Sequence, residues 1–125
     1  FDVYLFDHAP GLVERYASRL VVMPTLLDSQ SYMVFKRGCA LAQEEGRVVV
    51  PVGMRYRSDR AEQRLIASTL QAPLIRDRAV FANAFGRGET VFSSTQPYAN
   101  HGQAEILAVV EAITNTLSND YQEAA

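Results

Sequence analysis

One acidic residue, Asp7, follows a short apolar run and is followed in turn by Pro10 and Gly11. An acid at the end of a buried strand can hold the water shell of Mg²⁺, and the N–H of a glycine just after it can reach the γ-phosphate of a nucleotide. The same residue types also occur where an acid only caps the segment that follows. The spacing therefore indicates a site for phosphate and magnesium, with a structural cap as the other interpretation.

Further candidate binding residues stand directly after apolar runs that have the character of buried strands. Thr25 closes one such run, and arginines follow two later runs at residues 55–57 and 76–78. In an open parallel sheet, ligands bind outside the carboxyl ends of the strands. These are therefore the residues expected at a ligand site.

Charge is distributed unevenly along the chain, although the formal net charge is only −2. Residues 47–88 contain eight basic and three acidic residues, whereas residues 89–125 contain five acidic residues and no basic one. An arginine-rich segment is typical of a surface that contacts the phosphates of a nucleotide or a nucleic acid. A solvated helix face is the alternative, because arginines also pair with nearby acids along helices.

The other reactive side chains do not form a recognisable site. His8 and His101 have no cysteine or paired acid at metal-ligand spacing, and the serines lack the glycines of a nucleophile elbow. The single cysteine, Cys39, cannot form an internal disulfide, which indicates a reducing compartment and the cytoplasm as the expected location. The longest apolar runs have about five residues, far fewer than the roughly 20 that a membrane span needs.

The elements that must position these residues are predicted from hydrophobic periodicity. Four apolar runs have the character of buried strands: residues 3–7, 20–24, 47–56 and 73–75. Four segments carry apolar side chains three and four residues apart, as amphipathic helices do: residues 30–45, 61–70, 77–85 and 103–117. This alternation in a chain of 125 residues predicts one domain with an α/β fold, a mostly parallel sheet and helices on both faces.

Turn and cap residues set the expected ends of these elements. Asp28 or Ser29 is expected to cap the first helix, and Ser58 the second. Pro51 lies within the third strand and argues for an edge position, a bulge or the functional end of that strand. Residues 89–100 are rich in Ser, Thr, Gln and Pro and are expected to form a loop.

Taken in order, these motifs follow a familiar succession: Asp7-x-x-Pro10-Gly11, a run ending in Pro24-Thr25, a helix, a strand with Arg55, then Pro73 and a late Arg/Ala/Gly/Val segment that includes Arg76. The succession resembles the carboxyl-terminal half of the ParA/MinD partition ATPases, the deviant Walker A branch of the P-loop NTPases. The resemblance covers residues 1–92, the family-like core, while the loop and terminal amphipathic helix at 93–125 match only in kind. It implies a partial P-loop NTPase-like fold.

The resemblance implies that Asp7 is the catalytic Walker B acid, which holds Mg²⁺ through water, and that Pro10 and Gly11 belong to the switch loop. A Walker A loop needs a glycine-rich turn followed by a lysine and a Ser or Thr. The only lysine, Lys36, has no such turn before it. We therefore expect that an amino-terminal half is missing, that ATP and Mg²⁺ bind tightly only to the intact protein, and that this chain alone does not hydrolyse ATP.

The resemblance also implies four nucleotide-binding residues. Thr25 would lie on the phosphate side, and Arg55 would stand where the family often has an Asn-Arg pair that contacts the base. Here the pair is Met54-Arg55, a departure from that pattern. Pro73 and Arg76 would form the second wall of the base pocket.

The function implied is ATP-dependent partition or stability of a plasmid or chromosome. ATP would bring two subunits together, the homodimer would bind DNA without sequence preference through Arg57, Arg60 and Arg64, and a ParB-like adaptor would trigger hydrolysis on the bacterial nucleoid. A membrane partner is not expected, because residues 103–125 carry acids and neither Lys nor Arg. The alternatives are a conjugation or division-site positioning ATPase, and a non-catalytic interaction or regulatory module that dimerises through an exposed sheet edge.

Overall fold

The computed structural model describes residues 3–8 and 16–124 of the chain. Within them, three strands alternate with helices and a long helix ends the chain. The elements in order are β1 (Leu20–Leu26), α1 (Ser29–Glu44), β2 (Val48–Tyr56), α2 (Ala61–Leu70), β3 (Leu74–Arg76), α3 (Ala79–Gly86) and α4 (Ala99–Ala124). This order confirms the four predicted helices and the last three predicted strands, although α4 extends beyond its predicted range at both ends.

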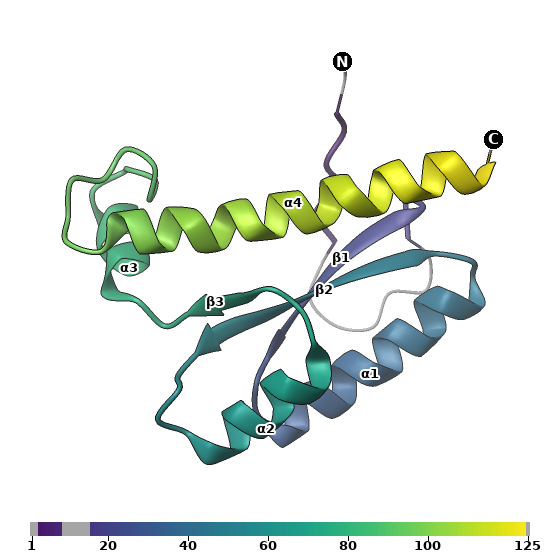
Figure 1. The fold of residues 1–125 in the computed structure, drawn as a ribbon, viewed down its shortest axis with the longest axis horizontal. Coiled ribbons are helices and arrows are strands. Elements are labelled where there is room, and N and C mark those ends of the chain that lie inside the picture. Colours follow the sequence, from purple (N-terminus) through teal and green to yellow (C-terminus); the bar gives the residue numbers. More distant parts are fainter. Residues whose placement is uncertain (1–2, 9–15, 125) are drawn as a thin grey trace.

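The strands are parallel, in the order β1-β2-β3, and helices cover both faces of the sheet. Figure 1 shows α1 and α2 on one side of the sheet and α4 on the other. Val21 of β1 and Ala42 of α1 belong to one buried cluster, against which Val49 of β2 packs. Val50 and Val52 of β2 point to the face opposite to that of Val49, where they are also buried. The predicted α/β fold is confirmed.

Both prolines of the strands occupy positions that need no N–H donor. The Val48 N–H donates to the Arg19 carbonyl (2.8 Å), so the backbone groups of Arg19 point towards β2. Along a parallel strand the backbone groups of successive residues point alternately to the two sides. Those of Pro24, five residues later, therefore point to the outer edge of β1. The Gly53 N–H donates to the residue before β3 (2.9 Å), and the pairing with β3 begins at Gly53. Pro51 therefore lies before the part of β2 that β3 pairs with, which explains how a central strand tolerates it.

The strand predicted at residues 3–7 is absent, so that prediction was wrong. Residues 3–8 adopt no regular element, and the apolar side chains at residues 3–6 are exposed. An apolar run becomes a strand only when a neighbour completes its hydrogen-bond ladder, and the three described strands bond only to one another. The last described residue of this segment, His8, contacts residues 16 and 17. The His8 Nε2 accepts the Ala17 N–H (3.4 Å), and the His8 ring lies edge-on to the Tyr16 ring, with 5.6 Å between the ring centres.

The expected helix caps have mixed outcomes. Asp28 caps α1, because its carboxylate accepts the Ser31 N–H (2.8 Å) and the Ser31 hydroxyl (2.8 Å). Ser58 does not cap α2, which begins at Ala61 with Arg60 in the N-cap position and no side-chain cap bond. Ser58 lies two positions before the N-cap residue, too far along the chain for its hydroxyl to serve as the cap of this helix.

A second buried cluster fixes the start of α4. Val80 of α3, Val91 of the following loop and Ala99 of α4 form it, with Phe81 packed against them. A Cβ on Gly102 would lie 2.9 Å from the Val91 side chain and 3.2 Å from the Phe81 ring, so only glycine allows this approach. This packing, which periodicity does not show, explains why α4 begins before its predicted start. Of the described helices, none combines the length and apolar character needed to cross a membrane.

Candidate ligand site at the carboxyl ends of the strands

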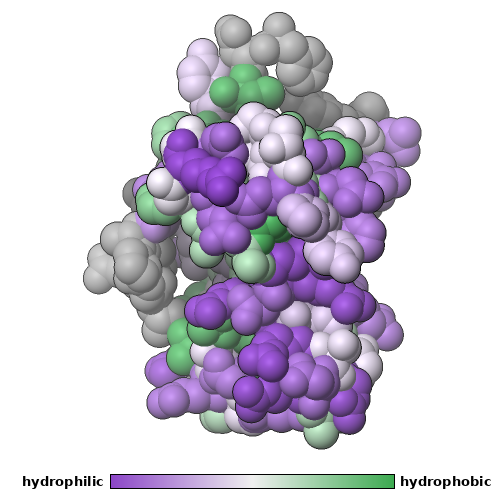
Figure 2. Space-filling view, turned by 90° about the vertical axis from the view of Figure 1, so that its left-hand side faces the viewer, coloured by the Kyte–Doolittle hydropathy of each residue, from purple (hydrophilic) through white to green (hydrophobic). Residues whose placement is uncertain are grey.

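An open hollow of about 260 Å³ lies at the carboxyl edge of the sheet. Its lining residues come from the ends of β1 and β2, from α2 and from the segment after β3: Leu26, Leu27, Asp28, Arg55, Arg57, Gln63 and Asp77. Figure 2 looks towards this side of the molecule and shows a largely hydrophilic surface. This is the edge at which parallel α/β sheets bind their ligands. The volume suits a small polar group or one part of a larger ligand.

Arg55 occupies a strained position at this edge. The register between β2 and β3 shifts between Gly53 and Tyr56, which marks an irregularity of the bulge type, and Arg55 within it has a left-handed φ of 55°. That conformation costs an L-residue about 1–2 kcal/mol. The Arg55 side chain is 71 % exposed, and its Nε lies 3.5 Å from the Asp77 Oδ1. The irregularity thus places an accessible guanidinium at the rim of the hollow.

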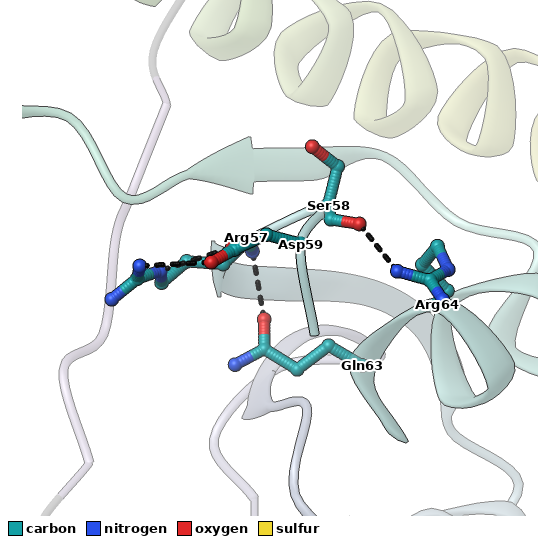
Figure 3. Close-up of polar contacts among 5 residues, drawn as sticks. All are labelled: Arg57, Ser58, Asp59, Gln63 and Arg64. Carbon is teal, nitrogen blue, oxygen red and sulfur yellow. Dashed lines mark hydrogen bonds and ion pairs between the residues drawn. The ribbon is translucent and has the colours of Figure 1, made fainter. Parts of the chain in front are cut away.

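Arg57 enters the hollow from the turn between β2 and α2. Its N–H donates to the Gln63 Oε1 (2.7 Å), which ties the end of β2 to the first turns of α2. Its guanidinium donates from Nε and Nη2 to the two oxygens of Asp59, at 3.3 and 3.1 Å (Figure 3). The hydrogen bonds and the charge of Arg57 lower the pKa of Asp59 from its ordinary value.

The charges that line the hollow balance formally. Arg55 and Arg57 line it together with Asp28 and Asp77. The pKa of Asp28 is lowered, because its carboxylate accepts hydrogen bonds from the Ser31 N–H and hydroxyl. An incoming anion must therefore draw the Arg55 guanidinium away from Asp77, an exposed ion pair of the kind worth about 0–1 kcal/mol. That contact is weak enough for a phosphate group to replace it.

The segment after β3 is tied to α4 by a carboxylate that sequence reasoning did not identify. The Glu105 Oε2 accepts the Arg76 N–H (3.1 Å), and its Oε1 accepts both Nε and Nη2 of Arg78 (3.1 and 2.7 Å). The guanidinium of Arg76 lies over the Tyr56 ring, 5.7 Å from its centre. A separation of 27 to 29 residues leaves no periodic signal that could have predicted these contacts.

Among the four residues predicted to bind nucleotide, Arg55 lines the hollow and Arg76 lies next to its Asp77 wall. Thr25 is buried in β1, and its hydroxyl donates to the Leu26 carbonyl (2.8 Å). Pro73 precedes β3, at the end of that strand opposite to the hollow. The structure therefore brings together only two of the four.

Of the predicted Walker B and switch residues, the structure describes only Asp7. Asp7 is exposed in the irregular segment 3–8 and does not line the hollow, contrary to its expected place at the end of a buried strand. Pro10 and Gly11 lie outside the described residues. Three polar lining residues, Asp28, Gln63 and Asp77, were not among the predicted binding residues, although Asp77 lies within the stretch 76–78 expected at the ligand edge. Asp77 could have been singled out, because it immediately follows the strand that ends at Arg76.

The three arginines predicted to bind DNA stand around the start of α2. Figure 3 shows the Arg57 and Arg64 side chains extending to opposite sides of the turn between β2 and α2. The Arg64 guanidinium donates to the Ser58 carbonyl (2.8 Å), and Arg60 is exposed. Two acids stand between these arginines in the sequence, and one of them, Glu62, accepts the N–H (3.0 Å) and the hydroxyl of Ser29. The surface is therefore a set of separate guanidinium groups with acids among them.

Comparison with known proteins finds no matching family model, no matching curated protein and no matching solved structure. No group of three or more His, Cys, Asp or Glu residues that could hold a metal ion occurs within the described part of the chain. What the site offers chemically is recognition of an anion by the exposed Arg55 guanidinium at the edge of a parallel sheet, beside Arg57, whose guanidinium is bound by Asp59.

Proposed function

We propose that this chain supplies part of the nucleotide site of a ParA-like ATPase. The observation that carries the proposal is Arg55, a left-handed non-glycine residue at the rim of the hollow at the carboxyl edge of a parallel sheet. Backbone strain of this kind clusters at functional sites, where it aims a side chain. A guanidinium aimed into the ligand edge of an α/β sheet is suited to the base, ribose or phosphate of a nucleotide.

The residues present fit one portion of Mg-ATP. The hollow offers Arg55 and Arg57 to an anionic or polar group, and Arg76 precedes the lining residue Asp77 in the chain. Mg²⁺ is commonly held by one or two carboxylates together with the phosphates of the nucleotide. For Asp7 to take this role, the segment at residues 3–8, which does not line the hollow, must pack against it in the longer protein. Bound Mg-ATP would supply the phosphoryl group for hydrolysis, whereas Arg55 and Arg57 would bind and orient it.

The proposal extends to partition of a plasmid or chromosome in the bacterial cytoplasm, at the nucleoid. Two nucleotide-bound copies would form a dimer that binds DNA without sequence preference, and a ParB-like adaptor would trigger hydrolysis. The exposed arginines at residues 57, 60 and 64 support DNA as the partner. Residues 89–125, which include α4, carry five acids and no base and would be repelled by an anionic membrane.

Calorimetry with Mg-ATP tests the proposal on two proteins: this chain, and the same chain with its upstream coding sequence up to a glycine-rich phosphate loop. We expect binding by the longer protein and weaker binding by its Arg55→Ala variant. Arg37→Ala is the control, because Arg37 lies on α1 and does not line the hollow. In the longer protein, Asp7→Ala is expected to abolish Mg-dependent hydrolysis and to leave the fold intact. Absence of binding by both proteins would overturn the proposal.

A non-catalytic interaction module is the second candidate, and exposed apolar surface favours it. The outer edge of β1 has no partner strand among the described residues, and Val22 and Leu26 of that strand are 40 % and 44 % exposed. The side chains at residues 3–6 are 59–93 % exposed. Light scattering that shows a stable dimer of the chain without nucleotide, together with no Mg-ATP binding, would support this function over the first.

A further inference from the structure

Glu105 is the most highly connected carboxylate in the described chain, and its contacts meet beside the hollow. Both of its oxygens accept hydrogen bonds, one from a backbone N–H and the other from two atoms of a guanidinium. The side chains of Glu105 and Arg78 are only 15 % and 20 % exposed. Charge-assisted bonds shielded in this way hold geometry far more firmly than surface ion pairs do.

The segment that Glu105 holds carries one wall of the hollow. Glu105 bonds Arg76 and Arg78, the residues on either side of Asp77. The Asp77 N–H donates to the Tyr56 carbonyl of β2 (3.0 Å), which fixes the middle of the segment against the sheet. The Asp77 backbone is therefore fixed, and its carboxylate lies 3.5 Å from the Arg55 Nε.

We propose that Glu105 is a positioning residue for the ligand site. It fixes the segment at residues 76–78, this segment directs the Asp77 carboxylate, and the carboxylate holds the Arg55 guanidinium at the rim of the hollow until an anion takes its place. The inference rests on the proposed nucleotide function for what the ligand is, but the chain of contacts from Glu105 to Arg55 can be tested without any ligand. A glutamine at position 105 has one acceptor oxygen and no charge, so it cannot serve both Arg76 and Arg78.

A purely structural role is the competing explanation, since Glu105 also joins α4 to β3 and α3. The chain contains a matched control for that role. Asp120 of α4 pairs with Arg19 before β1 (2.8 Å), which ties the same helix to the sheet at a place outside the hollow. Asp120→Asn therefore breaks an ion pair of α4 and leaves the residues around Asp77 untouched.

The first experiment uses NMR on the chain without ligand. We expect Glu105→Gln to shift the Arg55 Nε–H resonance and to speed exchange of the Asp77 amide hydrogen about tenfold or more relative to wild type. Asp120→Asn should leave both signals unchanged. Equal effects of the two variants on Arg55 and Asp77, or no effect of either, would overturn the positioning role. If Glu105→Gln does not fold, Arg78→Lys replaces it, because lysine keeps the charge and loses the two-point contact.

The second experiment measures the affinity of the nucleotide-binding protein for Mg-ATP. Loss of a residue that supports a ligand contact typically weakens binding about tenfold or more, and we expect that loss for Glu105→Gln and no loss for Asp120→Asn. Wild-type protein that does not bind Mg-ATP would refute the proposed function and leave the NMR result to decide the positioning role. If the wild type binds Mg-ATP and Glu105→Gln binds it equally well, the positioning role alone is refuted.

Discussion

Arg55 offers a direct test of the strain at the carboxyl edge of the sheet. Its φ of 55° is left-handed, a conformation in which a Cβ is unfavourable and glycine is not. Arg55→Gly and Arg55→Ala both remove the guanidinium and its ion pair with Asp77, so the two variants differ only by a Cβ. The difference between their stabilities isolates the strain.

The expected magnitude follows from two opposing terms. Relief of the left-handed conformation favours glycine by about 1–2 kcal/mol. The greater backbone freedom of glycine in the unfolded chain opposes this by about 0.5–1 kcal/mol. Arg55→Gly should therefore be more stable than Arg55→Ala by about 1 kcal/mol, which corresponds to about 4 °C in Tm for a domain of this size. Loss of the ion pair between Arg55, whose side chain is 71 % exposed, and Asp77 lowers the stability of both variants equally.

Gln71 provides the control. It ends α2 in a left-handed conformation with φ of 48°, and its N–H donates to the Ala67 carbonyl in an ordinary helix cap. Gln71→Gly should exceed Gln71→Ala in stability by a similar amount, and neither variant should change ligand binding, because Gln71 does not line the hollow.

Urea denaturation followed by circular dichroism gives the free energy of unfolding for all four variants. An Arg55→Ala protein as stable as Arg55→Gly, in an experiment where the Gln71 pair shows the expected difference, would refute the reasoning. It would mean that the irregularity in β2 relaxes in solution and that Arg55 is not held under strain.

Two further predictions concern charge. In the nucleotide-bound protein, replacing Arg57, Arg60 and Arg64 with Glu should weaken DNA binding and lower the slope of log K against log salt by about 0.9 for each lost phosphate contact. The control is Lys36→Glu with Arg37→Glu on α1, two charge reversals against three. Equal slopes for both sets in fluorescence anisotropy would restore the solvated-face interpretation. Asp28→Ala should cost about 1 kcal/mol at pH 7 through loss of the α1 cap. The folded-state pKa of Asp28 is lowered, so its carboxylate contributes to stability above the ordinary pKa of 3.8, and this contribution is lost as the pH falls through the folded-state pKa. Urea titrations should therefore show that the stabilities of Asp28→Asn and wild type differ at pH 7 and converge in acid. A stability difference that does not depend on pH would contradict this.

Most of the fold was predictable from sequence because its elements carry their own local signals. The apolar run of β1, the Asp28 cap of α1 and the periodicity of α2 each identify an element without reference to the rest of the chain. The exception is the run at residues 3–7. Its composition matches β1, but a strand also needs a neighbour to complete its ladder, and composition does not provide one.

The candidate site was less predictable, because its geometry depends on contacts between elements. The sequence identified Arg55 from its place at the end of an apolar run, but not its left-handed backbone, which accompanies the register shift against β3. Gln63 lines the hollow and bonds the Arg57 N–H, and Glu105 reaches Arg78 from another helix. Such side chains look like ordinary solvated positions until the elements are packed together.

Pro24 has a consequence for how the molecule behaves at high concentration. An outer strand rich in valine and leucine is a template on which further chains can stack in cross-β fashion. Pro24 lies among the last residues of β1 and removes the amide hydrogen at a position that faces outward. A strand that pairs with this edge lacks one N–H donor at Pro24 and meets the proline ring there. Pro24 therefore disfavours fibril growth along an edge strand whose composition would otherwise promote it.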